Sequence, residues 1–297
     1  MYGVLDKSFR VLPGKLSILS GKKIAVIGGT AGIGQSLARL AALNGSEVTV
    51  VGRTFRDSGL NEKYLGFQQA DLSRMANAVI AAQSLPVEQL DYIAFTNGIV
   101  PGNTRVVTAE GVEQDMAVSA LSRYVFIKTI LPRLKSNSRI FIWGFPGTSG
   151  LLKQTNLEDF NSERSYAGGF GTAHMNTVAL NEALVHYLAS KGIEAYGLNP
   201  GLIKSGIRDS VHGGSGGIMG TILESMIALF NPTAEDYVKK LLPVLLSSDL
   251  SLHKGAMFGQ NADPIKPSPE FASTKLVTEW ITAADMLATK ALAVKRS

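Results

Sequence analysis

A glycine-rich segment with the sequence GGTAGIG spans residues 28–34, and its residue types and spacing can bind phosphate. It follows the apolar run Ile24–Ile27 and leads into a helical pattern. Glycines let the backbone approach a pyrophosphate closely, and the N-terminus of the next helix supplies free N–H groups. Because the strand–turn–helix context makes this pattern specific, we predict a dinucleotide-binding turn. Its predicted cofactor contacts are Gly28, Thr30, Gly32, Ile33 and Gly34.

The end of the second apolar run indicates which dinucleotide is bound. An acidic residue there would bind the ribose 2′-hydroxyl of NAD, but the sequence reads Gly52-Arg53-Thr54. A guanidinium binds phosphate through paired hydrogen bonds. We therefore predict NADP(H) as the cofactor, with Arg53 and Thr54 at its 2′-phosphate; the alternative is that Arg53 is a solvated loop cation.

Two further side chains could transfer a proton. Tyr166 lies in a glycine-rich stretch that could fold it inward, and His174 carries an imidazole, which can act as acid or base near neutral pH. Serine, histidine and aspartate are all present, but no Gly-x-Ser-x-Gly elbow follows a predicted strand, which argues against a hydrolase.

The elements that must position these residues form a regular alternation. Short apolar runs alternate with helical patterns, which is typical of βαβ units and a parallel sheet. Most runs are continuously apolar, as expected for strands that helices cover on both faces. We predict an α/β protein with a three-layer Rossmann fold and a doubly wound parallel sheet of about seven strands. The predicted strands are Lys23–Gly28, Glu47–Gly52, Gly66–Ala70, Tyr92–Thr96, Arg139–Trp143, Glu194–Leu198 and Ala256–Phe258.

The domain organisation follows from the same pattern. We predict an N-terminal extension over residues 1–20, a dinucleotide-binding domain over residues 21–260, and a C-terminal helix within residues 261–297 that packs on the same domain. Within the domain, a Gly- and Ser-rich stretch followed by an apolar helical pattern predicts a substrate lid over residues 205–230. The alternative is a surface helix packed on the body.

Two long helices, residues 111–135 and 172–190, are predicted beside the sheet. The second is apolar on two sides, so it must bury two sides. One side can face the sheet and the other a second subunit. We therefore expect a homodimer through these two helices.

Composition excludes several classes of function. The chain has 297 residues, a net charge of +5 and no cysteine, which rules out disulfides and Cys–zinc sites. Its basic residues are scattered rather than clustered, which argues against a nucleic-acid partner. The absence of an 18-residue apolar stretch argues against a membrane span, and the four histidines lack the spacing of metal ligands. We expect a cytoplasmic protein that acts on a small molecule, with no membrane partner and no metal.

Three further motifs follow the predicted strands in order: Asp71-Leu72, Asn97-Gly98-Ile99 and Asn199-Pro200-Gly201. With the glycine-rich turn, this set resembles the short-chain dehydrogenase/reductase family from about Gly21 to Phe258. The resemblance implies that Asp71 and Leu72 border the adenine, that Asn97 and Gly98 support the sheet and the cofactor, and that Pro200 and Gly201 border the nicotinamide. It also adds Ile203 and Ser205 to the expected cofactor contacts, because Ser205 lies where a family threonine often contacts the cofactor.

The family's reductases use a tyrosine, a lysine four residues later, a serine and an asparagine to deliver a proton. Counting back from Asn199-Pro200-Gly201 places Phe170 at the tyrosine position and His174 at the lysine position. Gly144 stands at the serine position and Ser119 at the asparagine position. A positioned general acid contributes ~10²–10⁴ in rate. Ordinary carbonyl reduction by the family mechanism is therefore expected to be absent or slow.

Substitutes for the missing groups are present. Tyr166 or His174 could replace the acid, although His174 could instead bind a ribose hydroxyl as the family lysine does. Thr148 or Ser149 could replace the missing hydroxyl. If Tyr166 itself is the family tyrosine, Phe170 falls at the lysine position and the pair is still broken.

Two functions remain open. The first is an NADP(H)-dependent oxidoreductase with atypical catalytic residues, which transfers hydride to or from a small carbonyl or alcohol. The second is a catalytically inactive NADP(H)-binding sensor, regulator or scaffold.

Overall fold

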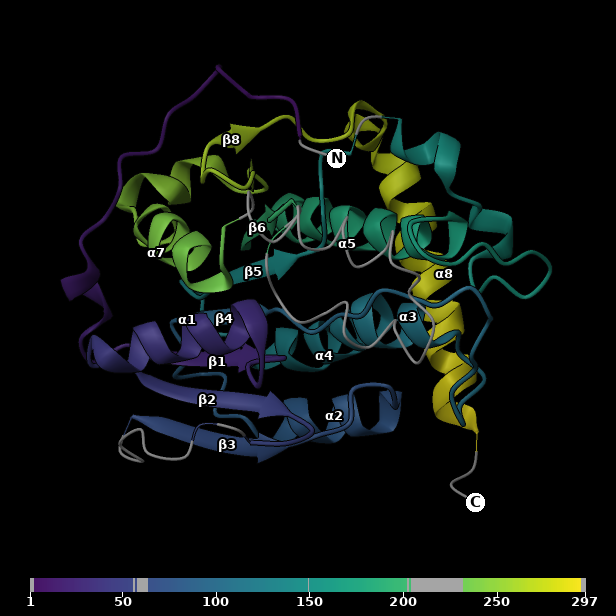
Figure 1. Ribbon diagram of the computed structural model, residues 1–297, viewed down its shortest axis with the longest axis horizontal. Helices are drawn as coiled ribbons and strands as arrows, with labels where there is room; N and C mark the ends of the chain where they lie inside the picture. The colour runs from purple at the N-terminus through teal and green to yellow at the C-terminus, as the bar shows by residue number, and fades with distance from the viewer. Residues whose placement is uncertain are drawn as a thin grey trace, which may run out of the picture.

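In the described part of the chain, eight strands form one sheet in the order β3-β2-β1-β4-β5-β6-β7-β8 (Figure 1). The computed structural model describes residues 3–55, 57, 64–148, 150–201, 203 and 232–294. Neighbouring strands are parallel except for β7 and β8, which are antiparallel. The order reverses beside β1, because β2 and β4 lie on its two sides, and ligands bind at such a reversal in open α/β sheets.

The strands are β1 Lys23–Ile27, β2 Glu47–Gly52, β3 Leu65–Gln69, β4 Tyr92–Phe95, β5 Arg139–Trp143, β6 Glu194–Leu198, β7 Met257–Phe258 and β8 Pro264–Ile265. The α-helices are α1 Gly32–Leu43, α2 Met75–Ser84, α3 Gln114–Met116, α4 Ser122–Ile130, α5 Thr172–Ser190, α7 Ala234–Leu245 and α8 Thr274–Ala293. A π-helical turn, Ala117–Leu121, joins α3 to α4. Short 3-10 helices occupy Leu16–Leu19, Leu131–Arg133, Leu151–Gln154, Leu157–Asp159, Ser248–His253 and Pro269–Ala272.

The predicted doubly wound α/β sheet is confirmed. Three predicted strands match β2, β5 and β6 residue for residue. The predictions for β1, β4 and β7 differ by one residue at one end, and the prediction for β3 is shifted by one residue. The first strand ends at Ile27 because Gly28 has a φ of 88°, which is outside the range of a strand. Strand β8 was missed, because it is two residues long and begins with Pro264, and a proline argues against a strand.

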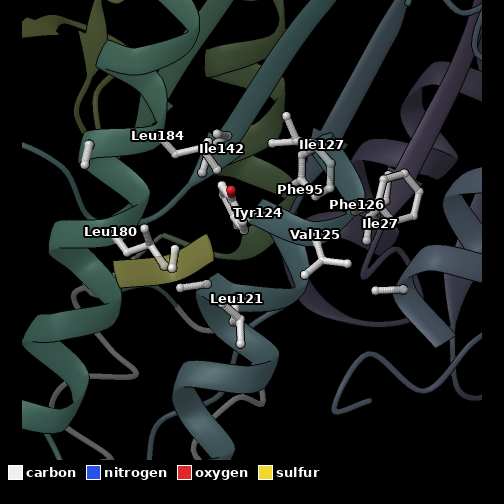
Figure 2. Close-up of a cluster of buried hydrophobic side chains, with 14 of the residues drawn as sticks. Ile27, Phe95, Leu121, Tyr124, Val125, Phe126, Ile127, Ile142, Leu180 and Leu184 are labelled. Atoms are coloured by element: carbon white, nitrogen blue, oxygen red, sulfur yellow. The ribbon is translucent and has the colours of Figure 1, made fainter. Parts of the chain in front are cut away.

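Two apolar cores lie on opposite faces of the sheet. On one face α2, α4 and α5 pack against it, and on the other α1 and α7 do. Figure 2 shows part of the first core, where Ile27, Phe95 and Ile142 from three neighbouring strands meet side chains of α4 and α5. The rings of Phe95 and Phe126 meet edge to face, with centroids 5.5 Å apart. These contacts fix α4 and α5 against the carboxyl ends of the central strands.

The predicted helix over residues 111–135 is shorter than expected. The helical run begins at Gln114 and ends at Arg133. Before it, Gly111 takes a φ of 79° in a turn, and Val107 pairs with Glu113 in an isolated β-bridge. The Glu113 side chain then accepts a hydrogen bond from the N–H of Met116, which caps the helix. The turn and the cap together fix the later start.

Helix α8 covers the outer side of α4 and α5 within the same chain (Figure 1). Its Trp280 is buried beside Phe160, with ring centroids 5.7 Å apart. Asp285 accepts a 2.8 Å hydrogen bond from the Tyr124 hydroxyl of α4. This packing corrects the argument for a homodimer through residues 111–135 and 172–190, because the second apolar side of α5 is already buried by α8. The homodimer itself stays a prediction, which the mass in solution tests.

The N-terminal segment, residues 3–20, packs on the domain. Leu5 forms a β-bridge with Ile265 of β8, and the Lys266 N–H donates to the Val4 carbonyl. Further along, the Gly14 N–H donates a 2.7 Å hydrogen bond to the carbonyl of Pro243 in α7. The segment runs past α7 on its way to β1 (Figure 1). It therefore protects the open edge of β8, which would otherwise leave backbone groups unpaired.

Across the described residues, none of the helices combines the length and the hydropathy that crossing a membrane requires.

Packing of α8 yields the first prediction. Replacing the buried Trp280 with alanine leaves a cavity beside Phe160 and Phe271, and should lower the free energy of unfolding by about 3–5 kcal/mol. Met286→Ala on the same helix is the matched control, because Met286 is 70% exposed and its loss should cost less than about 0.5 kcal/mol. Urea unfolding measures both. Equal stabilities of the two variants would contradict the packing described.

Candidate active site

The glycine-rich turn is packed too closely for larger residues. A Cβ added to Gly28 would lie 2.3 Å from the backbone nitrogen of Asn97, and one added to Gly34 would lie 2.5 Å from the Gly28 carbonyl oxygen. Helix α1 begins at Gly32, and its N-cap Ala31 gives no side-chain capping bond. Its first N–H groups are thus left for a ligand. A dinucleotide's pyrophosphate fits this turn, because the glycines permit close approach and the helix end favours an anion.

The predicted 2′-phosphate contacts lie at the end of β2. Arg53 and Thr54 are exposed. Gly52 leaves room for Thr30, because a Cβ at position 52 would lie 2.6 Å from Cγ2 of Thr30. Arg53 and Asp71 line one hollow together with Gln69. The carboxylate of Asp71 accepts hydrogen bonds from the N–H and hydroxyl of Ser73, so it shapes its own turn. Leu72 is buried beside it.

A pocket at the carboxyl ends of the central strands brings most of the predicted site residues together. Its lining is mostly apolar with a few polar side chains, among them Ser119, His174 and Asn181, which is typical of small-molecule sites. Predicted residues that line it are Ile33, Gly98, Ser119, Gly144, Phe170, His174, Pro200, Gly201 and Ile203. Asn97 lies next to this lining and is buried. Ser205 and the predicted lid over residues 205–230 lie outside the described residues.

His174 is paired with a buried carboxylate that the sequence reasoning missed. Its Nδ1 lies 2.7 Å from Oδ2 of Asp115, and both side chains are buried. The other carboxylate oxygen accepts a hydrogen bond from the Ser119 hydroxyl, which in turn accepts the Ile99 N–H at 3.0 Å. The carboxylate therefore fixes the imidazole with Nδ1 protonated and leaves Nε2 for another partner. The π-helical turn Ala117–Leu121 carries Ser119 into this position.

Arg123 is the second functional residue that sequence reasoning missed. Its side chain donates hydrogen bonds to the carbonyl of Trp143 at 2.8 Å, to Oδ1 of Asn181 at 2.9 Å and to the carbonyl of Asn97. Burial lowers the pKa of Arg123 to about 9, and the negative charge of Asp115 opposes that shift. The guanidinium is therefore charged at neutral pH. An arginine directly before the apolar run Tyr124–Ile127 was the signal that could have revealed it.

Close packing against Asn181 requires a glycine at position 144. A Cβ at this position would lie 2.4 Å from Cβ of Asn181, so the family's serine does not fit here. Asn181 itself donates to the carbonyls of Ser119 and Thr177, at 2.9 and 2.8 Å. The asparagine thus occupies the space of the serine while connecting α5 to the helix that carries Ser119.

The hydroxyls of Tyr166 and Thr148, the other predicted substitutes, are bonded to backbone carbonyls. Tyr166 is outside the residues that line the pocket, and its hydroxyl donates to the Gly102 carbonyl at 2.9 Å. Burial, reinforced by Glu113 and Asp115, raises the pKa of Tyr166 to about 12, which makes the phenol a poorer acid. Thr148 is buried, and its hydroxyl donates to the Phe145 carbonyl. Ser149 lies outside the described residues, and the role of Tyr166 stays a prediction.

Two aromatic rings flank the imidazole. Phe170 is 50% exposed and meets His174 edge to face, with centroids 5.4 Å apart. Phe145, which also lines the pocket, meets His174 edge to face with centroids 6.3 Å apart. Its φ of 54° is unusual for a bulky residue. The rings give His174 an apolar surround.

Comparisons with known proteins agree with this architecture. No model of a known protein family matches the chain. The chain is 36% identical over 280 residues to an uncharacterized oxidoreductase of Saccharomyces cerevisiae, covering 91% of this chain and 88% of that one. It is 25% identical over 205 residues to retinol dehydrogenase 12 of Bos taurus, covering 63% of each chain.

Solved structures show the same fold. An uncharacterized protein of Mycobacterium paratuberculosis matches with a TM-score of 0.66 at 16% identity, covering 94% of this chain and 98% of that chain. A short chain dehydrogenase of Escherichia coli, complexed with NADPH, matches with a TM-score of 0.58 at 19% identity, covering 82% and 98%.

A glycine-rich turn between β1 and α1, at the edge where the strand order reverses, defines a Rossmann-type α/β protein. The chain belongs to the short-chain dehydrogenase/reductase family.

Contact between residues 144 and 181 yields the second prediction. Gly144→Ser, which restores the family's serine, should lower the free energy of unfolding by about 1–3 kcal/mol because the new Cβ overlaps Asn181. Combining it with Asn181→Gly, which removes the Cβ that the new side chain overlaps, should cost less than the sum of the single changes. Gly102→Ser is the control, since a Cβ there meets nothing within 4 Å. Additive effects in thermal or urea unfolding would argue against the overlap.

Proposed function

We propose that the protein is an NADP(H)-dependent oxidoreductase that interconverts a small carbonyl compound and its alcohol, with His174 as the proton donor and acceptor. The observation that carries this proposal is the 2.7 Å contact between Nδ1 of His174 and Asp115, at the wall of the pocket that Pro200, Gly201 and Ile33 also line. A histidine backed by a carboxylate is an effective general acid and base.

When bound, the dinucleotide supplies the hydride, and the chain must supply the proton. In the direction of reduction, the protonated imidazole of His174 donates its Nε2 proton to the carbonyl oxygen of the substrate. Asp115 holds the ring in place and stabilises its positive charge. In the direction of oxidation, Nε2 accepts the proton of the alcohol. The rings of Phe145 and Phe170 limit the access of water to the imidazole.

His174 is favoured over its polar neighbours because their hydrogen-bonding groups are engaged. The Ser119 hydroxyl donates to Asp115, and the Thr177 hydroxyl donates to the His174 carbonyl at 2.8 Å. The Asn181 amide bonds backbone carbonyls and Arg123. Among the described residues that line the pocket, these contacts leave His174 as the side chain best able to exchange a proton.

The preference for NADP(H) over NAD(H) rests on the end of β2. Arg53 and Thr54 stand where an acidic residue would bind the ribose of NAD, and Arg53 lines the hollow beside Asp71. A fold neighbour complexed with NADPH supports this assignment.

A non-catalytic role is the second candidate. Phe170 and Gly144 remove the two hydroxyl groups on which the family's chemistry depends, and the observed packing at Gly144 leaves no space to restore one. A protein that binds NADP(H) without turnover would act as a sensor, regulator or scaffold. Binding of NADPH together with no oxidation of it by any aldehyde or ketone in a panel would favour this candidate.

Substitution at His174 yields the third prediction. His174→Ala should lower kcat for carbonyl reduction by ~10²–10⁴, because the general acid is removed. Asp115→Asn should also lower kcat, because the imidazolium of His174 loses the negative charge that stabilises it. The affinity for NADPH in His174→Ala should change by less than about tenfold. Pre-steady-state NADPH oxidation and fluorescence titration measure the two quantities.

Tyr166→Phe distinguishes the two sequence-predicted proton donors. The variant should keep the wild-type kcat, because the hydroxyl is bonded to Gly102 outside the pocket lining. A loss of rate in Tyr166→Phe with none in His174→Ala would transfer the role to Tyr166. A primary role for His174 in ribose binding would instead raise the Kd for NADPH and leave kcat unchanged.

Cofactor choice yields the fourth prediction. Arg53→Ala should weaken NADPH binding by roughly 10- to 100-fold, because a charge-assisted contact to phosphate is lost, and should leave NADH binding unchanged. Lys7→Ala removes the same charge from an exposed position in the N-terminal segment and serves as the control. Calorimetric titration with both dinucleotides measures the effect. Tighter binding of NADH than NADPH by the wild-type protein would overturn the assignment.

A further inference from the structure

Arg123 places a positive charge at the wall of the candidate active site. It lines the pocket with Gly98, Trp143 and Pro200, and its side chain is only 2% exposed. Its three acceptors, two backbone carbonyls and the Asn181 amide oxygen, are all neutral. Within the described residues, no carboxylate lies within ion-pair distance of the guanidinium. Its positive charge is therefore held by dipoles and is not cancelled by a direct partner.

The negative charge that partly compensates Arg123 is not part of the pocket wall. Asp115 attracts Arg123 electrostatically, but its carboxylate is bonded to His174 and Ser119 and it is absent from the pocket lining. Charges interact strongly across a dry interior because the effective dielectric constant is low. A group that enters this pocket therefore experiences the guanidinium more directly than the carboxylate.

The two states of a nicotinamide dinucleotide differ in charge at the ring. The oxidised ring carries one positive charge, whereas the reduced ring is neutral. A fixed positive charge at the pocket wall repels the first and does not repel the second. At the separations that one pocket allows, such a repulsion corresponds to roughly a 10- to 100-fold difference in affinity.

We propose that Arg123 makes this site discriminate between the redox states of its cofactor, so that the reduced dinucleotide binds more tightly than the oxidised one. The inference rests on the proposed binding of NADP(H) in this pocket, but it does not require catalysis. In an enzyme, the repulsion speeds release of the oxidised product. In a sensor, it lets occupancy report the ratio of reduced to oxidised cofactor.

Affinity ratios test the proposal directly. The Kd values of NADPH and NADP⁺ are measured by calorimetry for the wild-type protein, Arg123→Lys and Arg123→Gln. The wild-type protein should bind NADPH at least about tenfold more tightly than NADP⁺. Arg123→Lys, which keeps the charge, should retain most of this ratio. Arg123→Gln, which keeps donors but removes the charge, should bring the ratio toward one.

Asp115→Asn provides a test of opposite sign. Removing the compensating negative charge should raise the ratio further by weakening NADP⁺ binding, and this holds even if the Arg123 variants fail to fold. A wild-type ratio near one, an unchanged ratio in a folded Arg123→Gln, or a ratio that falls or stays the same in Asp115→Asn would overturn the proposal. Failure of the wild-type protein to bind either dinucleotide would overturn both this inference and the proposed function, whereas equal binding of both would overturn only the inference.

Discussion

The buried guanidinium of Arg123 connects the parts of the structure on which the site depends. It binds the carbonyl of Asn97 beyond β4, the carbonyl of Trp143 at the end of β5, and Asn181 on α5. A charge removed from water must be satisfied by several hydrogen bonds, or the fold becomes unstable. The ends of β4 and β5 and helix α5 are therefore held at a fixed spacing. This spacing sets the geometry of the pocket between them.

This constraint links the residues at the positions that the family resemblance assigns to catalysis. Asn181 serves Arg123 and fills the space of the serine, so residue 144 must be glycine. Ser119, at the asparagine position, shares the carboxylate of Asp115 with His174, at the lysine position. Ser119, His174 and Asn181 thus belong to one connected hydrogen-bond network with Asp115 and Arg123. Such buried networks specify one arrangement of the elements that they connect.

The two ends of the chain stabilise this arrangement from outside. Helix α8 buries the outer side of α5, whose inner side carries His174 and Asn181, and the N-terminal segment covers β8 and contacts α7. The apolarity of α5 was visible in the sequence, but its partner was not. Periodicity shows that a surface is buried and does not show what covers it. A distant helix of the same chain, such as α8, can cover the second apolar side of α5 as well as a second subunit can.

The sequence by itself determined the sheet and the glycine-rich turn. These features are local: buried strands are apolar runs, and the turn depends on glycines at fixed spacing. Only the tertiary structure decided which polar side chains meet at the pocket. Asp115 meets His174 across 59 residues of chain, and Arg123 meets Asn181 across 58. No periodicity encodes such contacts, because they arise when separate helices pack on one sheet and bring polar side chains to the same buried edge.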